Sequence, residues 1–145
     1  MKILVDTSVI VEIDRGNESV TSLLKSLVKA NTELVISTVT VSEILAGSYL
    51  TKDVRKAVMT AKEVLNQFLW VDLDGEVAEK TAQLLAYLLS EKRTIEYQDI
   101  VIAATFFTTR SDYLLTLNRK DFLAIPALNK KVYAPDEFRK IIKMH

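Results

Sequence analysis

Short segments that are apolar on both faces alternate along this chain with longer segments whose apolar residues recur at helical spacing. A strand that is apolar on both faces needs cover on both sides, which is typical of a parallel sheet between two layers of helices. The alternation predicts one α/β domain over residues 1–145, with a parallel sheet of about five strands in a three-layer α/β/α arrangement. The expected strands span residues 2–6, 33–37, 70–73, 112–117 and 130–134.

The segments between these strands are expected to be helices with one apolar stripe, except the segment after the first strand. Residues 7–18 are expected to be a connection broken near Gly16. Asp74 is a suitable N-cap, and Pro135 suits the first turn of a closing helix. The helix before the fourth strand is apolar on most sides, which indicates a buried helix. The expected helices span residues 19–30, 38–50, 52–69, 75–92, 97–109 and 135–144.

The residue types that the chain lacks exclude several kinds of chemistry. It contains no cysteine, and its one histidine is His145, the last residue. Ser-His and Cys-His nucleophile pairs are therefore excluded, as is a tetrahedral zinc site built from nitrogen and sulfur ligands. The three glycines lie too far apart for a phosphate-binding glycine loop. An enzyme with this composition is left with carboxylates, hydroxyls, amides, Lys, Arg and Tyr, together with a hard cation.

The distribution of apolar residues predicts a cytoplasmic protein that does not enter a membrane. No apolar run approaches the roughly 20 residues that a membrane-spanning helix needs. The opening sequence MKILVDTS reaches a carboxylate at Asp6, so no apolar signal region is expected. The absence of cysteine also removes the main support for a secreted, disulfide-bonded scaffold.

Acidic and amide side chains follow several of the predicted strands. Asp6 ends the first strand, Glu43 lies in the helix after the second, and Asn118 and Asp121 follow the fourth. Asp99 lies near the start of the buried helix that leads into the fourth strand. Ligands of parallel sheets bind outside the carboxyl ends of the strands, so these side chains are expected to meet at one edge. Carboxylates that repel one another gather where a hard divalent cation with oxygen ligands compensates them.

Ordinary structural roles also fit each of these acids. Asp6 suits an N-cap or an Asx turn, and Glu43 completes an S/T-x-x-E capping box with Thr40. Asp99 suits the first turn of a helix, where the helix dipole favours an acid. Asp121 suits a turn, where it would pair with Arg119 or Lys120. The joint placement of these acids, rather than any single one of them, therefore indicates a site.

Four segments together resemble the PIN-domain ribonuclease family, and within it the VapC-type toxins of toxin–antitoxin pairs. Their order and spacing along the chain carry the resemblance more than any one of them alone. With the order of strands and helices, the resemblance spans almost the whole chain. The segments are ILVDTSVIVE at 3–12, STVTVSEILAG at 37–47, DIVIAAT at 99–105 and LLTLNRKDF at 114–122.

The resemblance implies a metal-dependent endoribonuclease directed at single-stranded RNA, with Mg²⁺ or Mn²⁺ in an acidic pocket. Residue by residue, the acids of the family motifs fall on Asp6, Glu43 and Asp99, which are the expected metal ligands. The fourth position is open, because many members carry an aspartate where this chain has Asn118, and others carry a later acid such as Asp121. The expected catalytic residues are Asp6, Glu43, Asp99 and Asp121, acting on a water that the metal acidifies.

Four polar residues are expected to support this site through hydrogen bonds to ligands or phosphate. Ordinary turn capping explains three of them equally well, namely Thr7, Ser8 and Thr116. The fourth is Asn118, which brings no charge but coordinates or orients water. The supporting residues are Thr7, Ser8, Thr116 and Asn118.

One further departure from the family pattern lies just before the third acid. Glu96 and Tyr97 occupy a stretch where related toxins often have glycines, and they are expected to narrow the pocket or alter substrate choice.

The resemblance also implies partners, namely an RNA substrate, a small antitoxin protein and a second copy of the chain in a homodimer. Residues 20–28 and 47–58 are the expected walls of a groove for a partner helix, although a helix-rich core gives the same pattern. Exposed cations are candidates for guiding the RNA backbone, although a solvated face explains them equally. These cations are Arg119, Lys120, Lys130 and Lys131.

Other functions stay open at this point. A PIN nuclease of RNA processing or repair, outside toxin–antitoxin systems, fits the same acids. The unusual fourth position also fits a catalytically silent PIN-like module that binds RNA or protein. A receiver domain of response regulators also places aspartate at strand ends. However, it requires an acidic pair after the first strand, and Asp6-Thr7 does not provide one.

Overall fold

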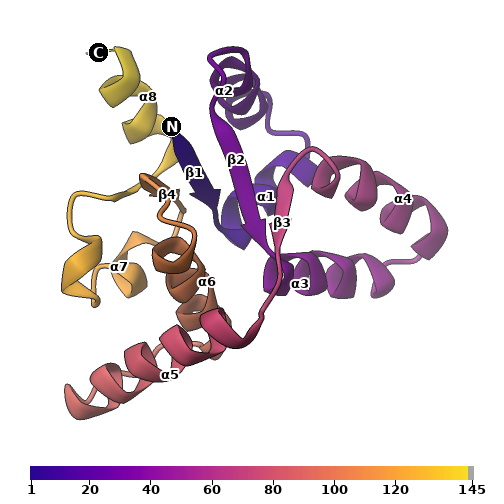
Figure 1. Cartoon of the computed structure of the whole chain (residues 1–145). Coiled ribbons are helices and arrows are strands. Elements are labelled where there is room, and N and C mark those ends of the chain that lie inside the picture. Colours follow the sequence, from indigo (N-terminus) through magenta and orange to yellow (C-terminus); the bar gives the residue numbers. More distant parts are fainter. Residues whose placement is uncertain (144–145) are drawn as a thin grey trace.

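The computed structural model describes residues 1–143. Residues 144–145, with the only histidine, His145, and the last residue of the expected closing helix, lie outside the described residues. Five parallel strands form one sheet in the order β3-β2-β1-β4-β5 (Figure 1). The expected parallel sheet is therefore confirmed. The strands are β1 (Lys2–Val5), β2 (Glu33–Ser37), β3 (Leu69–Val71), β4 (Tyr113–Leu115) and β5 (Val132–Tyr133).

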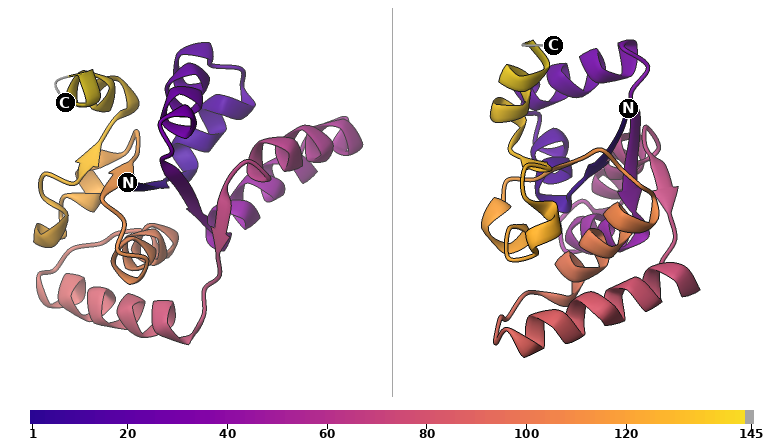
Figure 2. Two further views of the ribbon diagram at one scale, coloured as in Figure 1. Left: turned by 45° about the horizontal axis from the view of Figure 1, so that its top comes forward. Right: turned by 60° about the vertical axis from the view of Figure 1, so that its left-hand side comes forward.

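Helices cover both faces of this sheet, which confirms the three-layer α/β/α arrangement (Figure 2). A short 3-10 turn over Pro126–Leu128 completes the described elements. The helices are α1 (Thr7–Asp14), α2 (Glu18–Lys29), α3 (Thr38–Tyr49), α4 (Val54–Leu65), α5 (Gly75–Ser90), α6 (Tyr97–Thr108), α7 (Arg119–Phe122) and α8 (Pro135–Lys143).

The alternation of side chains along the central strand explains the two layers. Ile3 and Val5 of β1 point to the side covered by α1, α2, α4 and α8, whereas Leu4 points to the side covered by α5, α6 and α7. All three side chains are fully buried. Because β1 lies in the middle of the sheet, its carboxyl end is enclosed by neighbouring strands and by the helices that follow them.

The structure corrects the prediction for residues 7–18. The first of these residues begin α1 directly after Asp6, and the expected break falls at Gly16, whose φ is 86°. Gly16 adopts this left-handed conformation without the strain that a side chain would bring. The sequence did not indicate this helix, because Val9, Ile10 and Val11 are β-branched, a residue type typical of strands.

The remaining elements match the predictions in kind; β2 has the predicted bounds, and the bounds of the others differ by a few residues. Strand β5 pairs over only two residues, and α7 with the following 3-10 turn occupies a stretch for which no element was predicted. Among residues 1–143, no helix has the length and apolar character to cross a bilayer.

Candidate active site

Asp6 lies at the carboxyl end of the central strand and begins α1 as its N-cap. The residue is 3% exposed, and its Oδ2 accepts hydrogen bonds from Ser8 N (3.4 Å), Ser8 Oγ (2.7 Å) and Thr116 Oγ1 (2.8 Å). Its Oδ1 is buried and has no hydrogen-bond partner within the described residues. Because a buried carboxylate oxygen without a partner is costly, this atom indicates a ligand.

Backbone groups fix the two hydroxyls that contact Asp6. Ser8 Oγ accepts a hydrogen bond from Leu117 N (2.9 Å), and Thr116 Oγ1 accepts one from Asn118 N (2.9 Å). Each hydroxyl therefore uses its lone pairs for a backbone N–H and its hydrogen for the carboxylate. Oδ2 of Asp6 is therefore held in place by groups that follow β1 and β4, two neighbouring strands.

Glu43 reaches the same edge from the second turn of α3. The helix begins at Thr38 with Ser37 as its N-cap, so the capping-box alternative for Glu43 is wrong. Glu43 Oε1 accepts a hydrogen bond from Thr7 Oγ1 (2.8 Å), which also lies 2.9 Å from Thr40 Oγ1. The sequence interpretation missed Thr40 as a site residue, although its position three residues before Glu43 places both on one face of a helix.

Burial and neighbouring groups shift the pKa of Glu43. Glu43 is an exposed residue, and its Oε1 accepts the hydrogen bond from Thr7. Desolvation raises the pKa of Glu43 above its usual range, Thr7 acts in the opposite direction, and the charges of Asp6 and Glu96 raise the pKa further.

Asp99 lies in the first turn of α6, as expected, and is half-buried. Desolvation, together with the smaller effects of the negative charges on Asp6, Asp121, Glu43 and Glu96, raises the pKa of Asp99 to about 7. Acids from β1, α3, α6 and α7 therefore share one electrostatic environment. The structure thus brings together the four acids that the sequence singled out, although their catalytic and metal-binding roles stay predictions.

The fourth position combines an amide with an acid. Asn118 Nδ2 donates to Asp121 Oδ2 (2.8 Å), so the two candidates for this position contact each other. The alternative pairing of Asp121 with a neighbouring cation is wrong for Arg119, whose Nη1 contacts both carboxylate oxygens of Glu137 at 3.0 and 2.8 Å. No ion pair joins Lys120 to Asp121 either, within residues 1–143.

The arrangement of acids constrains how an ion would bind. No three acidic side chains of the described part of the chain converge closely enough to hold one metal ion among them. Mg²⁺ is usually held by one or two carboxylates and keeps several water ligands. The buried free Oδ1 of Asp6 and the uncompensated charge beside Asp99 fit such a water-rich site. The donor set is therefore all oxygen, as a hard cation requires.

Tyr97 and Glu96 lie at the start of α6, and both are exposed. Glu96 is the N-cap position of α6, but its side chain makes no capping hydrogen bond. We call Asp6, Glu43, Asp99 and Asp121 the acidic edge. The charge of Glu96 raises the pKa of both Glu43 and Asp99, so Glu96 is a neighbour of this edge.

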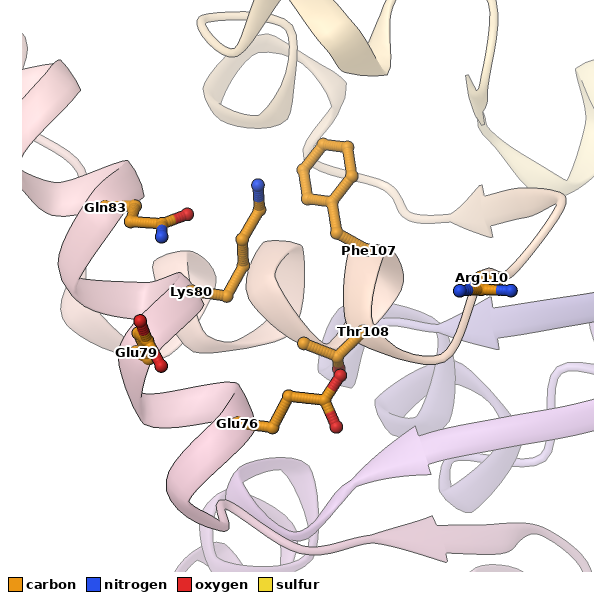
Figure 3. A pocket seen from close by; sticks show the side chains of 7 residues that line it. All are labelled: Glu76, Glu79, Lys80, Gln83, Phe107, Thr108 and Arg110. Atoms are coloured by element: carbon orange, nitrogen blue, oxygen red, sulfur yellow. The ribbon is translucent and has the colours of Figure 1, made fainter.

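A separate polar pocket lies between α5 and α6 and takes no part in this edge (Figure 3). It has a volume of about 320 Å³, and Lys80 Nζ lies 4.8 Å from the centre of the Phe107 ring that lines it. Phe107 follows Asp99 by eight positions in α6, a distance of about 12 Å along the helix axis. The side chains in the pocket therefore do not reach the acids at the start of α6.

Comparison with known proteins places this geometry in a family. A model of the family described as "PIN domain" matches residues 3–128. The chain belongs to the PIN domain family. Ribonuclease VapC of Rickettsia bellii is 33% identical to it over 131 residues, which cover 88% of this chain and 93% of that protein. Ribonuclease VapC19 of Mycobacterium tuberculosis is 30% identical over 126 residues, which cover 86% and 95% of the two chains.

The solved structures with the same fold include VapBC2 from Rickettsia felis, crystallised with a DNA fragment from its promoter. That structure superposes with a TM-score of 0.83 at 21% identity, covering 92% of this chain and 98% of the other. This similarity shows the fold, and the named relatives show the kinship to VapC proteins. The resemblance seen in the sequence is therefore confirmed, and this PIN domain is of the VapC type.

Proposed function

We propose that this VapC-type PIN domain is a metal-dependent endoribonuclease that acts on single-stranded RNA as the toxin of a toxin–antitoxin pair. The observation that supports the proposal most is the buried, unpartnered Oδ1 of Asp6 beside three further acids. The sequence contains no cysteine and only one histidine, His145, so a water acidified by a metal ion is the nucleophile that fits this composition. The relatives named ribonuclease VapC support RNA as the substrate class.

Asp6 and Asp99 would hold Mg²⁺ or Mn²⁺ directly, with Glu43 as a further ligand, direct or through water. When bound, such an ion acidifies a water and neutralises negative charge on the phosphate. Ser8 and Thr116 orient Asp6 through their hydroxyls. Asp121, oriented by the Asn118 amide, adds negative charge that acts on Asp99.

Glu43 is the carboxylate best placed to take the proton from the attacking water. Thr7 occupies its Oε1, and within residues 1–143 no group donates to Oε2. The pKa of Glu43 is raised, which favours a general base, and Asp99, whose pKa is also raised, would be occupied by the metal ion. The water oxygen forms a bond to phosphorus as its proton passes to Glu43, and the bond from phosphorus to the 3′-oxygen breaks. The leaving 3′-oxygen takes up a proton from solvent, which gives a 5′-phosphate and a 3′-hydroxyl.

The cations that were expected to guide the RNA backbone differ in availability. Arg119 is committed to Glu137, so it is not free for phosphate. Lys120, Lys130 and Lys131 are exposed and form no ion pair among the described residues, and they remain the candidates for backbone contacts.

The proposed antitoxin fits an apolar groove of about 440 Å³ beside α2. Residues of the expected wall 20–28 line it, whereas residues 47–58 do not and the end of α4 does. Its lining includes Leu24 and Val28 of α2, Val64 and Phe68, and the cations Lys25 and Lys29. A partner helix with an apolar stripe and acidic flanks matches this groove. The expected homodimer stays a prediction.

The proposed activity is tested with the purified chain and 5′-labelled single-stranded RNA in Mg²⁺, Mn²⁺ or EDTA. We expect metal-dependent cleavage that falls at least about 100-fold in Asp6→Asn and Asp99→Asn. Asp14→Asn, an exposed acid at the far end of α1, is the matched control and should cleave like the wild type. Cleavage that persists in EDTA or in Asp99→Asn would refute the proposal.

Cleavage by the wild type also separates the remaining functions. A chain that binds no metal and does not cleave RNA would be the silent PIN-like module. A cleaving chain whose gene has no small neighbouring antitoxin gene would be a PIN nuclease of RNA processing or repair.

A further inference from the structure

A paired arginine lies directly beside the acidic edge. Arg119 begins α7, between Asn118 and Asp121, yet its guanidinium turns to the C-terminal helix. Its Nη1 donates to Oε1 and Oε2 of Glu137 at 3.0 and 2.8 Å. Both side chains are only partly exposed. Glu137 therefore binds Arg119, which lies two residues before Asp121 in the chain.

The arginine adopts this position at a cost. Its Nε is buried and has no hydrogen-bond partner within residues 1–143. An unsatisfied buried donor destabilises the conformation that contains it. The contact with Glu137 is the interaction that offsets this cost, because it is charge-assisted.

Glu137 is fixed independently of the acidic edge. It lies in the first turn of α8, next to Phe138, which is fully buried. The Phe138 ring packs against Tyr113 of β4, with 5.1 Å between ring centres. Packing in the core therefore places the Glu137 carboxylate where it meets Arg119.

The acids themselves are left without a cation. Asp121 accepts from the Asn118 amide, and no ion pair of the described residues involves Asp6, Glu43, Asp99 or Asp121. Arg119 lies two positions before Asp121 in α7, and a guanidinium readily forms paired hydrogen bonds with carboxylates. An arginine released from Glu137 would thus compete with a divalent cation for the same oxygens.

We propose that Glu137 is a positioning residue, which holds Arg119 away from the acidic edge and so keeps the carboxylates available to a divalent cation. This inference rests on the proposed metal-dependent function and assigns the pair a role in it. Glu137 acts only through Arg119, so its influence on metal binding depends on the arginine being present.

The test is a double-mutant cycle on the full chain, with the dissociation constant for Mn²⁺ measured by isothermal titration calorimetry. The variants are Glu137→Gln, Arg119→Gln and both together, each checked for folding by thermal unfolding. Glu33→Gln is the matched control, because Glu33 lies 4.0 Å from Lys2 at the opposite end of the sheet. We expect Glu137→Gln to weaken Mn²⁺ binding about threefold to tenfold. Glu33→Gln should bind like the wild type.

The arginine variant decides between mechanisms. We expect Arg119→Gln to bind Mn²⁺ at least as tightly as the wild type, and Glu137→Gln to have no effect once Arg119 is Gln. An equal loss from Glu137→Gln in both backgrounds would show simple long-range charge and overturn the inference. A loss from Arg119→Gln itself would show that the pair braces α7, and would also overturn it.

The same experiment separates this inference from the proposed function. If the wild type binds Mn²⁺ and Glu137→Gln changes nothing, the inference fails and the metal site stands. If the wild type binds no Mn²⁺, both fail.

Discussion

At the scale of single residues, the two carboxylate oxygens of Asp6 have different roles. Oδ2 caps α1 and accepts two hydroxyl hydrogen bonds, whereas Oδ1 is buried and free. The two interpretations of Asp6 in the sequence, N-cap and ligand, therefore do not compete. The sequence could place such acids at strand ends, but it could not show which oxygen stays free, because this depends on Thr116, a residue 110 positions away.

The titration of Asp99 gives a prediction for the metal-free protein. Its pKa of about 7 in the folded chain lies above the unfolded value of 3.8. Between these values the folded state binds more protons than the unfolded state, so stability falls as the pH rises from about 4 to about 7. Asp99→Asn removes this loss. In EDTA the variant should be more stable than the wild type at pH 8, on the order of 1 kcal/mol after solvent screening.

The measurement is thermal unfolding in EDTA at pH 5 and pH 8. The gain from Asp99→Asn should be clearly smaller at pH 5, where the wild-type Asp99 is still protonated in the folded state. Added Mn²⁺ should stabilise the wild type and leave the variant nearly unchanged. A gain of equal size at both pH values would contradict the assigned pKa shift.

Thr116 gives a second prediction at this scale. Thr116→Val removes a donor to Asp6 and leaves the Asn118 N–H without its acceptor. We expect a loss of about 1–3 kcal/mol in the free energy of unfolding and weaker Mn²⁺ binding. Thr105→Val is the matched control, since Thr105 is equally buried and donates only to a carbonyl within its own helix. Equal Mn²⁺ affinities in the two variants would contradict the role of Thr116.

At the scale of elements, helical periodicity predicted where α2, α5 and α6 lie, because each presents a continuous apolar stripe or face to the core. It failed for α1, whose β-branched residues favour a strand and whose helix depends on the Asp6 cap. For the groove it predicted the wall formed by residues 20–28 and missed the end of α4. The second wall depends on how α4 packs against α1, which periodicity within one segment does not reveal.

The groove beside α2 predicts how the antitoxin binds. Val28 is 54% exposed and lines this groove, so Val28→Asp should place a charge among apolar partner side chains without disturbing the core. We expect at least a tenfold loss of affinity for the product of a neighbouring antitoxin gene, measured by calorimetry or co-purification. Leu89→Asp is the control, because Leu89 is 65% exposed on α5 and lies outside the groove. Loss of binding in the control alone would place the antitoxin elsewhere.

At the scale of the whole molecule, the strand order explains why the acids meet. The order β3-β2-β1-β4-β5 reverses direction between β1 and β4, and open sheets of this type bind ligands where the order reverses. Asp6 follows β1, and Thr116 follows β4. The sequence predicted a parallel sheet and an acidic edge, since short apolar strands and acids after them are local features. The strand order depends on long-range packing, so it became visible only in the structure.

The central claim is that this edge directs water at a phosphodiester of RNA. The most direct measurement is cleavage of single-stranded RNA in ¹⁸O-water with Mn²⁺, followed by mass spectrometry of the product ends. Attack by water predicts ¹⁸O in a new 5′-phosphate and a 3′-hydroxyl on the other fragment, with neither formed by Asp6→Asn. Products that end in a 2′,3′-cyclic phosphate and a 5′-hydroxyl would show attack by the RNA's own 2′-oxygen, and would contradict the role assigned to the acidic edge.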